Sequence, residues 1–207
     1  MTTLSLDESF AVAADGERIE RTAAALRAND FTTHVVDAPE DARRLVSELV
    51  PRDRGVFTAQ SETLRTAGIT ADLDESGAFT SIRAGAPAPS GDIYDVIRLG
   101  ALPDVVVGSV HAITEQGHLV VGSASGSQFA PYASGARQAI WVAGAQKIVP
   151  DLDTALGRLR TFSLPRENER LRERYGQTSF IARILILERE AFPDRGTVII
   201  VREPIGF

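Results

Sequence analysis

The sequence contains no cysteine. This absence excludes disulfides, thiolate nucleophiles, cysteine-ligated zinc and an iron–sulfur cluster held by this chain. Lysine is nearly absent as well: 21 of the 22 basic residues are arginine, and Lys147 is the single lysine. A lysine is a compact charge whose pKa responds to burial and whose amine can act as a nucleophile, so arginine is no substitute for it. Lys147 is therefore either a functional residue or a chance remnant in an arginine-rich chain.

Long hydrophobic runs are also missing. No stretch of about 18 apolar residues occurs, and Met1–Glu8 lack the basic and apolar regions of a secretory signal. We therefore predict no membrane contact and a cytoplasmic location. The net charge is −6, whereas nucleic-acid-binding proteins concentrate positive charge, so no nucleic-acid partner is expected. The arginines between Arg158 and Arg174 alternate with glutamates, which favours a solvated helix face.

Short apolar segments alternate with helical patterns along the 207 residues. Strands are expected at Phe31–Val36, Arg54–Thr58, Val105–Val107, Ala112–Thr114, Leu119–Val121, Ala139–Ala143, Ile184–Leu187 and Val198–Val201. Helices are expected from Glu17 to a C-cap at Asn29, and at Pro39–Leu49, Glu62–Ala67, Asp92–Gly100 and 151–162. Gly68–Ser90 is weakly patterned, and 84–91 reads as a surface loop or linker. The alternation predicts an α/β fold with a mostly parallel sheet flanked by helices.

One main domain with an N-terminal segment packed on it is expected. Residues 1–53 form an N-terminal helical and strand segment that packs on a main α/β domain of residues 54–207.

A glycine- and serine-rich loop, Gly122–Gln128, directly follows an apolar strand. Backbone N–H groups in such a loop can approach an anion, and the hydroxyls of Ser123, Ser125 and Ser127 add donors. The loop lacks the Gly-Lys-Ser/Thr ending of a phosphate-binding P-loop. A flexible surface turn explains the same composition.

A second candidate is the turn that holds Glu115 and Gly117. A carboxylate after a strand can serve as a base, a nucleophile or a hydrogen-bond acceptor, although a solvated turn glutamate gives the same pattern. His111, Glu115 and His118 would share one face of a helix and imitate a metal site. Because the surrounding pattern is that of strands, we predict no bound metal.

Ser61 stands at an expected strand-to-helix junction, where capping of the helix explains its hydroxyl. No Gly-x-Ser-x-Gly motif occurs, and the three histidines have no evident serine partner. A hydrolase triad is therefore unsupported by the sequence.

Four segments together resemble the LUD-domain family, the lactate-utilisation proteins of LutC/YkgG type. In chain order they are Ser61–Leu64, Ala112–Val120, Lys147–Ala155 and Val201–Phe207. The resemblance covers roughly residues 55 to 207, and it implies a fold like that of ribose-5-phosphate isomerase, glucosamine-phosphate deaminase and the CoA transferases. The residues that match by position are Ser61, Thr63, Glu115, Gly117, Lys147, Glu203 and Gly206.

The resemblance also implies a function: an accessory component of L-lactate oxidation to pyruvate, which accompanies iron–sulfur oxidoreductase subunits. This chain itself is expected to bind no cofactor. Lys147 would pair with the charge of a small anionic metabolite, and Glu115 would orient or deprotonate it. The predicted ligand-binding residues are Ser61, Thr63, Gly117, Gly122, Ser123, Ser125, Gly126, Ser127 and Glu203.

Two alternatives remain open. One is a stand-alone enzyme that acts on a sugar phosphate or acyl-CoA, with Glu115 as base or acyl acceptor. The other is a scaffold without chemistry, whose terminal strands and Arg/Glu-rich helix dock a partner. A homo-oligomer is compatible with all three hypotheses.

Overall fold

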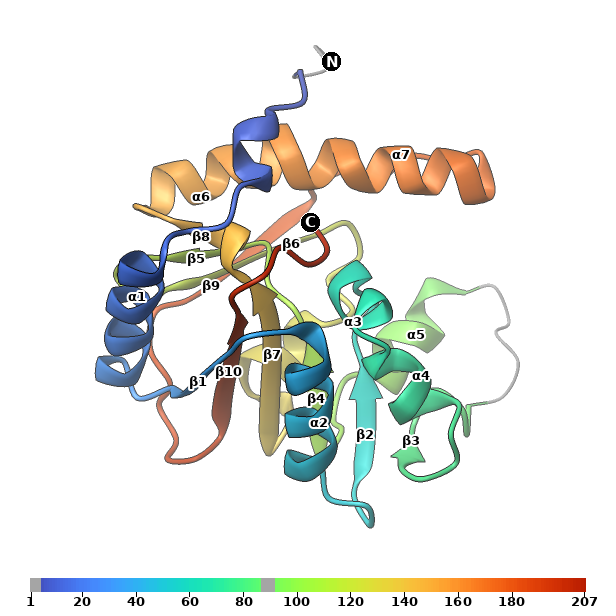
Figure 1. Ribbon diagram of the computed structural model, residues 1–207. Helices are drawn as coiled ribbons and strands as arrows, with labels where there is room; N and C mark the ends of the chain where they lie inside the picture. The colour runs from blue at the N-terminus through green and yellow to red at the C-terminus, as the bar shows by residue number, and fades with distance from the viewer. Residues whose placement is uncertain (1–4, 87–91) are drawn as a thin grey trace.

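A parallel six-stranded sheet forms the centre of the protein (Figure 1). The computed structural model describes residues 5–86 and 92–207. In spatial order the strands are β1 (Thr32–Val36), β10 (Gly196–Val201), β7 (Gln138–Gly144), β4 (Val105–Gly108), β2 (Gly55–Thr58) and β3 (Thr80–Ser81). Every neighbouring pair runs parallel. The predicted α/β fold with a mostly parallel sheet is therefore confirmed.

Helices cover both faces of this sheet, which is why its strands are apolar on both sides. In β10, Val198 and Ile200 pack toward one core and Ile199 and Val201 toward the other. The first core is shared with α1 (Gly16–Ala28) and the second with α2 (Pro39–Leu49), α3 (Glu62–Thr66) and α4 (Ile69–Asp74). This alternation follows from the two-residue repeat of a strand.

A smaller sheet lies beyond the carboxyl ends of the main strands (Figure 1). Its order is β8 (Ile148–Val149), β5 (Ala112–Thr114), β6 (Leu119–Ser123) and β9 (Arg183–Leu187). Strands β5 and β6 form an antiparallel hairpin. One side of the hairpin contributes Ile113 and Leu119 to the core under α1, and the other packs against α6 (Leu152–Arg158). The hairpin is thus fixed on both faces.

The helix after β8 is longer than the sequence predicts. It continues from α6 through a π-helical turn, η4 (Leu159–Ser163), into α7 (Leu164–Tyr175), which lies across one end of the molecule in Figure 1. Pro165 stands in the first turn of α7 and has no N–H to donate. The Thr161 carbonyl, four residues earlier, accepts instead from the Asp7 N–H at 2.9 Å. The predicted end at residue 162 is therefore wrong.

Two other predictions need correction or completion. The weakly patterned stretch Gly68–Ser90 contains α4 and β3, whereas residues 87–91 of the expected loop lie outside the described part of the chain. The helix predicted at Asp92–Gly100 is α5 (Ile93–Leu99). The remaining short helical turns are η1 (Glu8–Ala11), η2 (Pro131–Gly135) and η3 (Ala145–Lys147).

The N-terminal segment contributes an edge strand to the main sheet, because β1 pairs with β10 in parallel register. Within residues 5–86 and 92–207, no helix combines the length and the apolar character that crossing a membrane requires.

Candidate functional site

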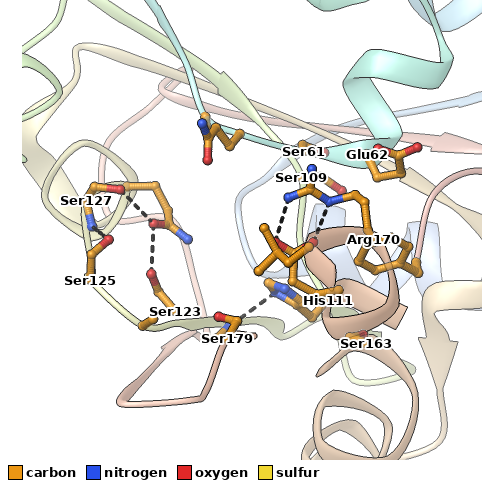
Figure 2. A pocket seen from close by; sticks show the side chains of 18 of the residues that line it. Ser61, Glu62, Ser109, His111, Ser123, Ser125, Ser127, Ser163, Arg170 and Ser179 are labelled. Carbon is orange, nitrogen blue, oxygen red and sulfur yellow. Dashed lines mark hydrogen bonds and ion pairs between the residues drawn. The ribbon is translucent and has the colours of Figure 1, made fainter. Parts of the chain in front are cut away.

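A cavity of about 740 Å³ opens at the carboxyl ends of the main strands. Figure 2 shows part of its lining: Ser61 and Glu62 from α3, Ser109 after β4, the serines of the Gly122–Gln128 loop, and Arg170 from α7. Ligands of open parallel sheets bind at this edge, because loops and helix N-termini converge there. Residues that follow the main strands thus form one wall of the cavity, and residues of α7 form another.

Lys147 lies at the floor of this cavity, with a side chain only 1% exposed. Its Nζ is 2.8 Å from Thr63 Oγ1, 3.0 Å from Ser109 Oγ and 3.0 Å from the Val110 carbonyl oxygen. These partners follow β2 and β4, and Lys147 follows β7, so three neighbouring strands bring the cluster together.

Thr63 is held in turn by the C-terminal tail. Its hydroxyl donates to the Ile205 carbonyl at 3.3 Å, and Gln146 Nε2 donates to the Ile205 and Gly206 carbonyls at 3.0 Å. Gly206 has a φ of 65°, and a Cβ there would lie 2.3 Å from Thr63 Oγ1. Glycine is therefore required for the tail to pack this closely. Thr63 has its one hydroxyl hydrogen committed to Ile205, so it can only accept from Lys147.

Burial lowers the pKa of Lys147 well below its ordinary value of 10.5, and the positive charge of Arg158 lowers it further. Removing an ammonium from water disfavours its charged form. Lys147 therefore loses its proton at a lower pH than an exposed lysine does.

His111 lines the same cavity and is held as a neutral imidazole. Burial lowers its pKa from 6.5 to about 3, and the charges of Lys147 and Arg158 act in the same direction. Its Nδ1 accepts a hydrogen bond from the Gly122 backbone N–H at 3.2 Å. Nε2 must then carry the hydrogen, which makes His111 a hydrogen-bond donor at the cavity.

Arg158 is completely buried behind this cluster, so the predicted solvated face is wrong at this position. The guanidinium donates to the Gln146 carbonyl at 3.3 Å, to Ser163 Oγ at 3.0 Å and to the His111 carbonyl. Its third nitrogen has no hydrogen-bond partner among the described residues. Burial lowers its pKa to about 9. Arg158 therefore places a positive charge directly beneath the cavity.

The lining of the cavity as a whole, floor and rim together, is basic. Among the described residues that line it, five are basic and three acidic, in a protein with a net charge of −6. The basic set is Arg65, Arg83, Lys147, Arg170 and Arg174, and the acidic set is Glu62, Asp74 and Glu167. Arg170 Nε lies 2.7 Å from a Glu167 oxygen (Figure 2). The remaining α7 arginines, as predicted, are exposed or make surface ion pairs.

The glycine- and serine-rich loop lines the cavity, but its hydroxyls bond mainly within the loop (Figure 2). Ser123 Oγ accepts from the Gly126 N–H at 2.9 Å and donates to Gln128 at 3.2 Å. Ser125 accepts from the Ser127 N–H at 3.3 Å. Gly122, Ser123, Ser125 and Ser127 face the cavity, whereas Gly126, at a φ of 76°, shapes the turn. Ser61 both lines the cavity and caps α3 by accepting from the Leu64 N–H at 3.3 Å.

Glu115 lies apart from Lys147. It stands at the far end of β5, where one oxygen is 2.8 Å from Arg18 Nε on α1 and the other is 3.7 Å from Arg21. Gly117, at a φ of 81°, packs so closely on α1 that a Cβ would lie 2.7 Å from the Ala25 backbone. Neither residue lines the cavity, and neither does Glu203, which is exposed.

Sequence reasoning missed Ser109, Tyr132 and the role of Arg158. Ser109 directly follows the apolar strand β4, and a polar residue in that position was a usable signal. Tyr132 was not recognisable, because it reaches the site from η2: its hydroxyl accepts from the Ser109 N–H at 3.0 Å and donates to the Ser109 carbonyl at 3.2 Å. Burial raises its pKa.

In the part of the chain that the structure describes, no cluster of three metal-ligating side chains forms.

The comparisons with known proteins agree with this architecture. A DUF162 family protein from Deinococcus radiodurans, solved as a crystal structure, is similar to this chain with a TM-score of 0.56 and 11% identity, covering 92% of this chain and 99% of that one. At that identity the likeness shows the fold alone.

A second solved structure, eIF2B beta from Chaetomium thermophilum, has a TM-score of 0.31 at 11% identity, over 65% of this chain and 44% of that one. Such a likeness is too low to support an argument. No curated protein sequence matches the chain. The profile of the LUD domain, however, matches residues 19–201. The resemblance seen in four segments thus extends over most of the sequence, and the chain belongs to the LUD-domain family.

Proposed function

We propose that this LUD-domain protein binds a small anionic metabolite in the cavity above Lys147, as a cytoplasmic accessory component of L-lactate utilisation. The observation that carries the proposal is a pair of buried basic side chains. Lys147 and Arg158 are 1% and 0% exposed, and in residues 5–86 and 92–207 neither forms an ion pair with a carboxylate. Buried positive charge is costly unless a negative group offsets it.

An anion in the cavity supplies that negative group. It would accept from the Nε2–H of His111 and from the rim arginines, while Lys147 and Arg158 attract it from below. Arginine binds carboxylates and phosphates with two parallel hydrogen bonds, so Arg174 on α7 is suited to hold its outer end. Arg170 makes two such bonds to Glu167 and adds positive charge beside it. Lactate and pyruvate both carry such a carboxylate.

The lactate assignment is supported by the family alone. The chain has no cysteine with which to hold an iron–sulfur cluster, so the oxidation itself would take place in iron–sulfur partner subunits. Affinity purification from cells grown on L-lactate should recover those subunits with the tagged protein. Recovery of none of them would contradict the accessory role and leave binding of the anion as a separate question.

The size of the cavity favours a second candidate. About 740 Å³ falls in the range of roughly 300–1,000 Å³ that holds drug-sized ligands, which is far more space than a three-carbon acid fills. A sugar phosphate or acyl-CoA would occupy more of it, and its phosphates would meet the same arginines. A stand-alone enzyme acting on such a compound is therefore the alternative, as the fold relatives implied by the resemblance suggest.

Calorimetric titration tests both candidates. The ligands are L-lactate, pyruvate, ribose 5-phosphate and acetyl-CoA, with glycerol as an uncharged control. We expect an anion to bind, and binding to weaken in an Arg170→Gln/Arg174→Gln variant. Arg172→Gln is the matched control, because Arg172 is exposed on the same helix and does not line the cavity.

Preference for lactate or pyruvate supports the first candidate, and preference for a phosphate ester or acetyl-CoA supports the second. Absence of binding by all four anions would contradict both. If Arg172→Gln weakened anion binding equally, the effect would come from the overall charge of α7 and not from contacts in the cavity.

A further inference from the structure

The cluster at the cavity floor has the geometry of a nucleophile, a base and an orienting group. Ser109 Oγ is 3.0 Å from Lys147 Nζ, and Nζ is 2.8 Å from Thr63 Oγ1. Serine nucleophiles activated by an adjacent base, which a third group holds in place, are found on unrelated folds, and lysine serves as the base in some of them. We propose that Ser109 is an acyl-accepting nucleophile and Lys147 its general base, in an activity toward esters or thioesters of anionic compounds.

The hydrogen bonds assign each position around the lysine nitrogen. Thr63 Oγ1 can only accept, because its hydrogen goes to the Ile205 carbonyl, and the Val110 carbonyl oxygen likewise only accepts. Two N–H bonds of a neutral amine are therefore directed at Thr63 and Val110. In the structure Nζ also donates to Ser109 Oγ, and the Ser109 hydroxyl donates to Thr63 Oγ1 and to the Val110 carbonyl, each at 3.3 Å. When the amine loses its third proton, its lone pair faces Ser109 Oγ at 3.0 Å, and rotation of the hydroxyl directs that hydrogen to Nζ. Thr63 acts as a positioning residue.

An anion in the cavity favours the charged amine, and burial favours loss of its proton when no anion offsets the charge. The pKa of Lys147 is depressed by desolvation and by Arg158; the other titratable group that interacts with it is His111, which stays uncharged. Ser109, in contrast, is only partly buried and lines the cavity. A substrate can thus reach the hydroxyl while the base stays protected from water.

The backbone around Ser109 is fixed by Tyr132, whose hydroxyl bonds both its N–H and its carbonyl. Gly108 permits this contact, because a Cβ there would overlap the tyrosine hydroxyl. A nucleophile held on a rigid support loses little entropy on reaction. The neutral His111, two residues along the chain, carries Nε2–H as a donor for the oxyanion that forms on the acyl carbon.

The reaction balances without a redox partner. Ser109 Oγ bonds to the acyl carbon, its proton passes to Lys147 Nζ, and the bond from the acyl carbon to the leaving group breaks as Nζ protonates that group. Water then attacks the acyl-serine, Nζ accepts a proton from the water, and Ser109 is released with that proton on Oγ. The products are a carboxylic acid and an alcohol or thiol. The basic rim selects substrates whose acyl or leaving group is anionic.

The inference goes beyond anion binding, because it does not depend on which anion occupies the cavity. A fluorophosphonate probe tests it: a serine nucleophile displaces fluoride and gains a stable adduct that intact-protein and peptide mass spectrometry locate. We expect one adduct on Ser109, none in Ser109→Ala, and unchanged labelling in Ser134→Ala, where the serine is exposed on η2 outside the cavity. Lys147→Met should label roughly 100-fold more slowly, the usual contribution of a general base.

The pH profile of wild-type labelling provides a readout that needs no variant. Labelling should slow on acidification as the amine is protonated, with a midpoint well below 10.5. Three outcomes would overturn the assignment. They are a folded wild-type protein that gains no adduct, an adduct that persists in Ser109→Ala, and a labelling rate that depends on neither Lys147 nor pH. Labelling of Ser109 without any binding of anions would support the Ser109–Lys147 assignment and contradict the proposed anionic ligand. Binding of anions without labelling would support the ligand and contradict the Ser109–Lys147 assignment.

Discussion

The two ends of the β5–β6 hairpin both carry a glycine and a polar side chain, but they serve different purposes. At the turn, Glu115 pairs with Arg18 and Gly117 packs on the backbone of α1. At the open end, His111 and Gly122 border the cavity and are joined by a hydrogen bond. The turn therefore fixes the hairpin to α1, and the open end belongs to the candidate site. A polar motif beside a glycine does not by itself mark the functional end of a hairpin.

Replacement of the turn glycine should have the largest effect. In Gly117→Ala the new Cβ would lie 2.7 Å from backbone atoms of α1, at a φ of 81° that side chains disfavour. We expect a loss of about 3 kcal/mol or more in the free energy of unfolding, measured with urea. A loss below about 1 kcal/mol would show that the turn does not depend on its contact with α1.

At the open end of the hairpin, His111 should make the free energy of unfolding depend on pH. The folded-state pKa of His111 is about 3, below the ordinary 6.5, so the unfolded chain binds more protons as the pH falls through 6.5. The neutral imidazole therefore contributes stability that is present above pH 6.5 and lost between 6.5 and 3, at up to about 1.4 kcal/mol per pH unit. Urea unfolding at pH 6.5 and 5.0 should show a steeper loss for the wild type than for His111→Gln. Equal slopes would mean that the imidazole is charged or solvated.

The glycine at the open end should tolerate change better than the one at the turn. A Cβ at Gly122 would meet the end of the Leu159 side chain at 2.7 Å, and that side chain can move, whereas a backbone cannot. We expect Gly122→Ala to lower the free energy of unfolding by about 1 kcal/mol. A loss as large as that of Gly117→Ala would remove the difference between the two ends.

The smallest effect is expected at Glu115. Its side chain is 24% exposed, and partly exposed ion pairs contribute less than about 1 kcal/mol. Glu115→Gln should therefore reduce stability only slightly, and a double-mutant cycle with Arg18→Gln should give a coupling energy of the same size. A coupling energy above about 2 kcal/mol would make the ion pair a principal anchor of the hairpin.

Most of the fold could be predicted from the sequence, because the patterns that indicate its strands and helices are local. The uninterrupted apolar segments of β4 and β10 predict buried parallel strands, and the helix at Pro39–Leu49 is confirmed residue for residue. Missed elements depend on tertiary contacts. Strand β3 has two residues and pairs only with β2 among the described residues, and the π turn at Leu159–Ser163 has no sequence signature.

Only part of the candidate site could be predicted from the sequence. A single lysine in an arginine-rich chain pointed to Lys147, which the structure places at the floor of the cavity. The pattern could not reveal that Glu115 is drawn to α1, because Arg18 lies 97 residues away in the sequence. Nor could it show that Arg158 turns inward, whereas Arg160 and Arg172 on the same continuous helix are exposed. Pairings at such separations are set by the fold.

Lys147, and not Glu115, belongs to the cavity in which we propose that an anion binds. The most direct test is the anion-induced rise in melting temperature of the wild type, Lys147→Met and Glu115→Gln, with the anion that calorimetry selects. At about 100 times the dissociation constant, a ligand stabilises the folded state by about 2.7 kcal/mol. We predict that Glu115→Gln keeps this rise and Lys147→Met loses it. Loss in Glu115→Gln with retention in Lys147→Met would contradict the account.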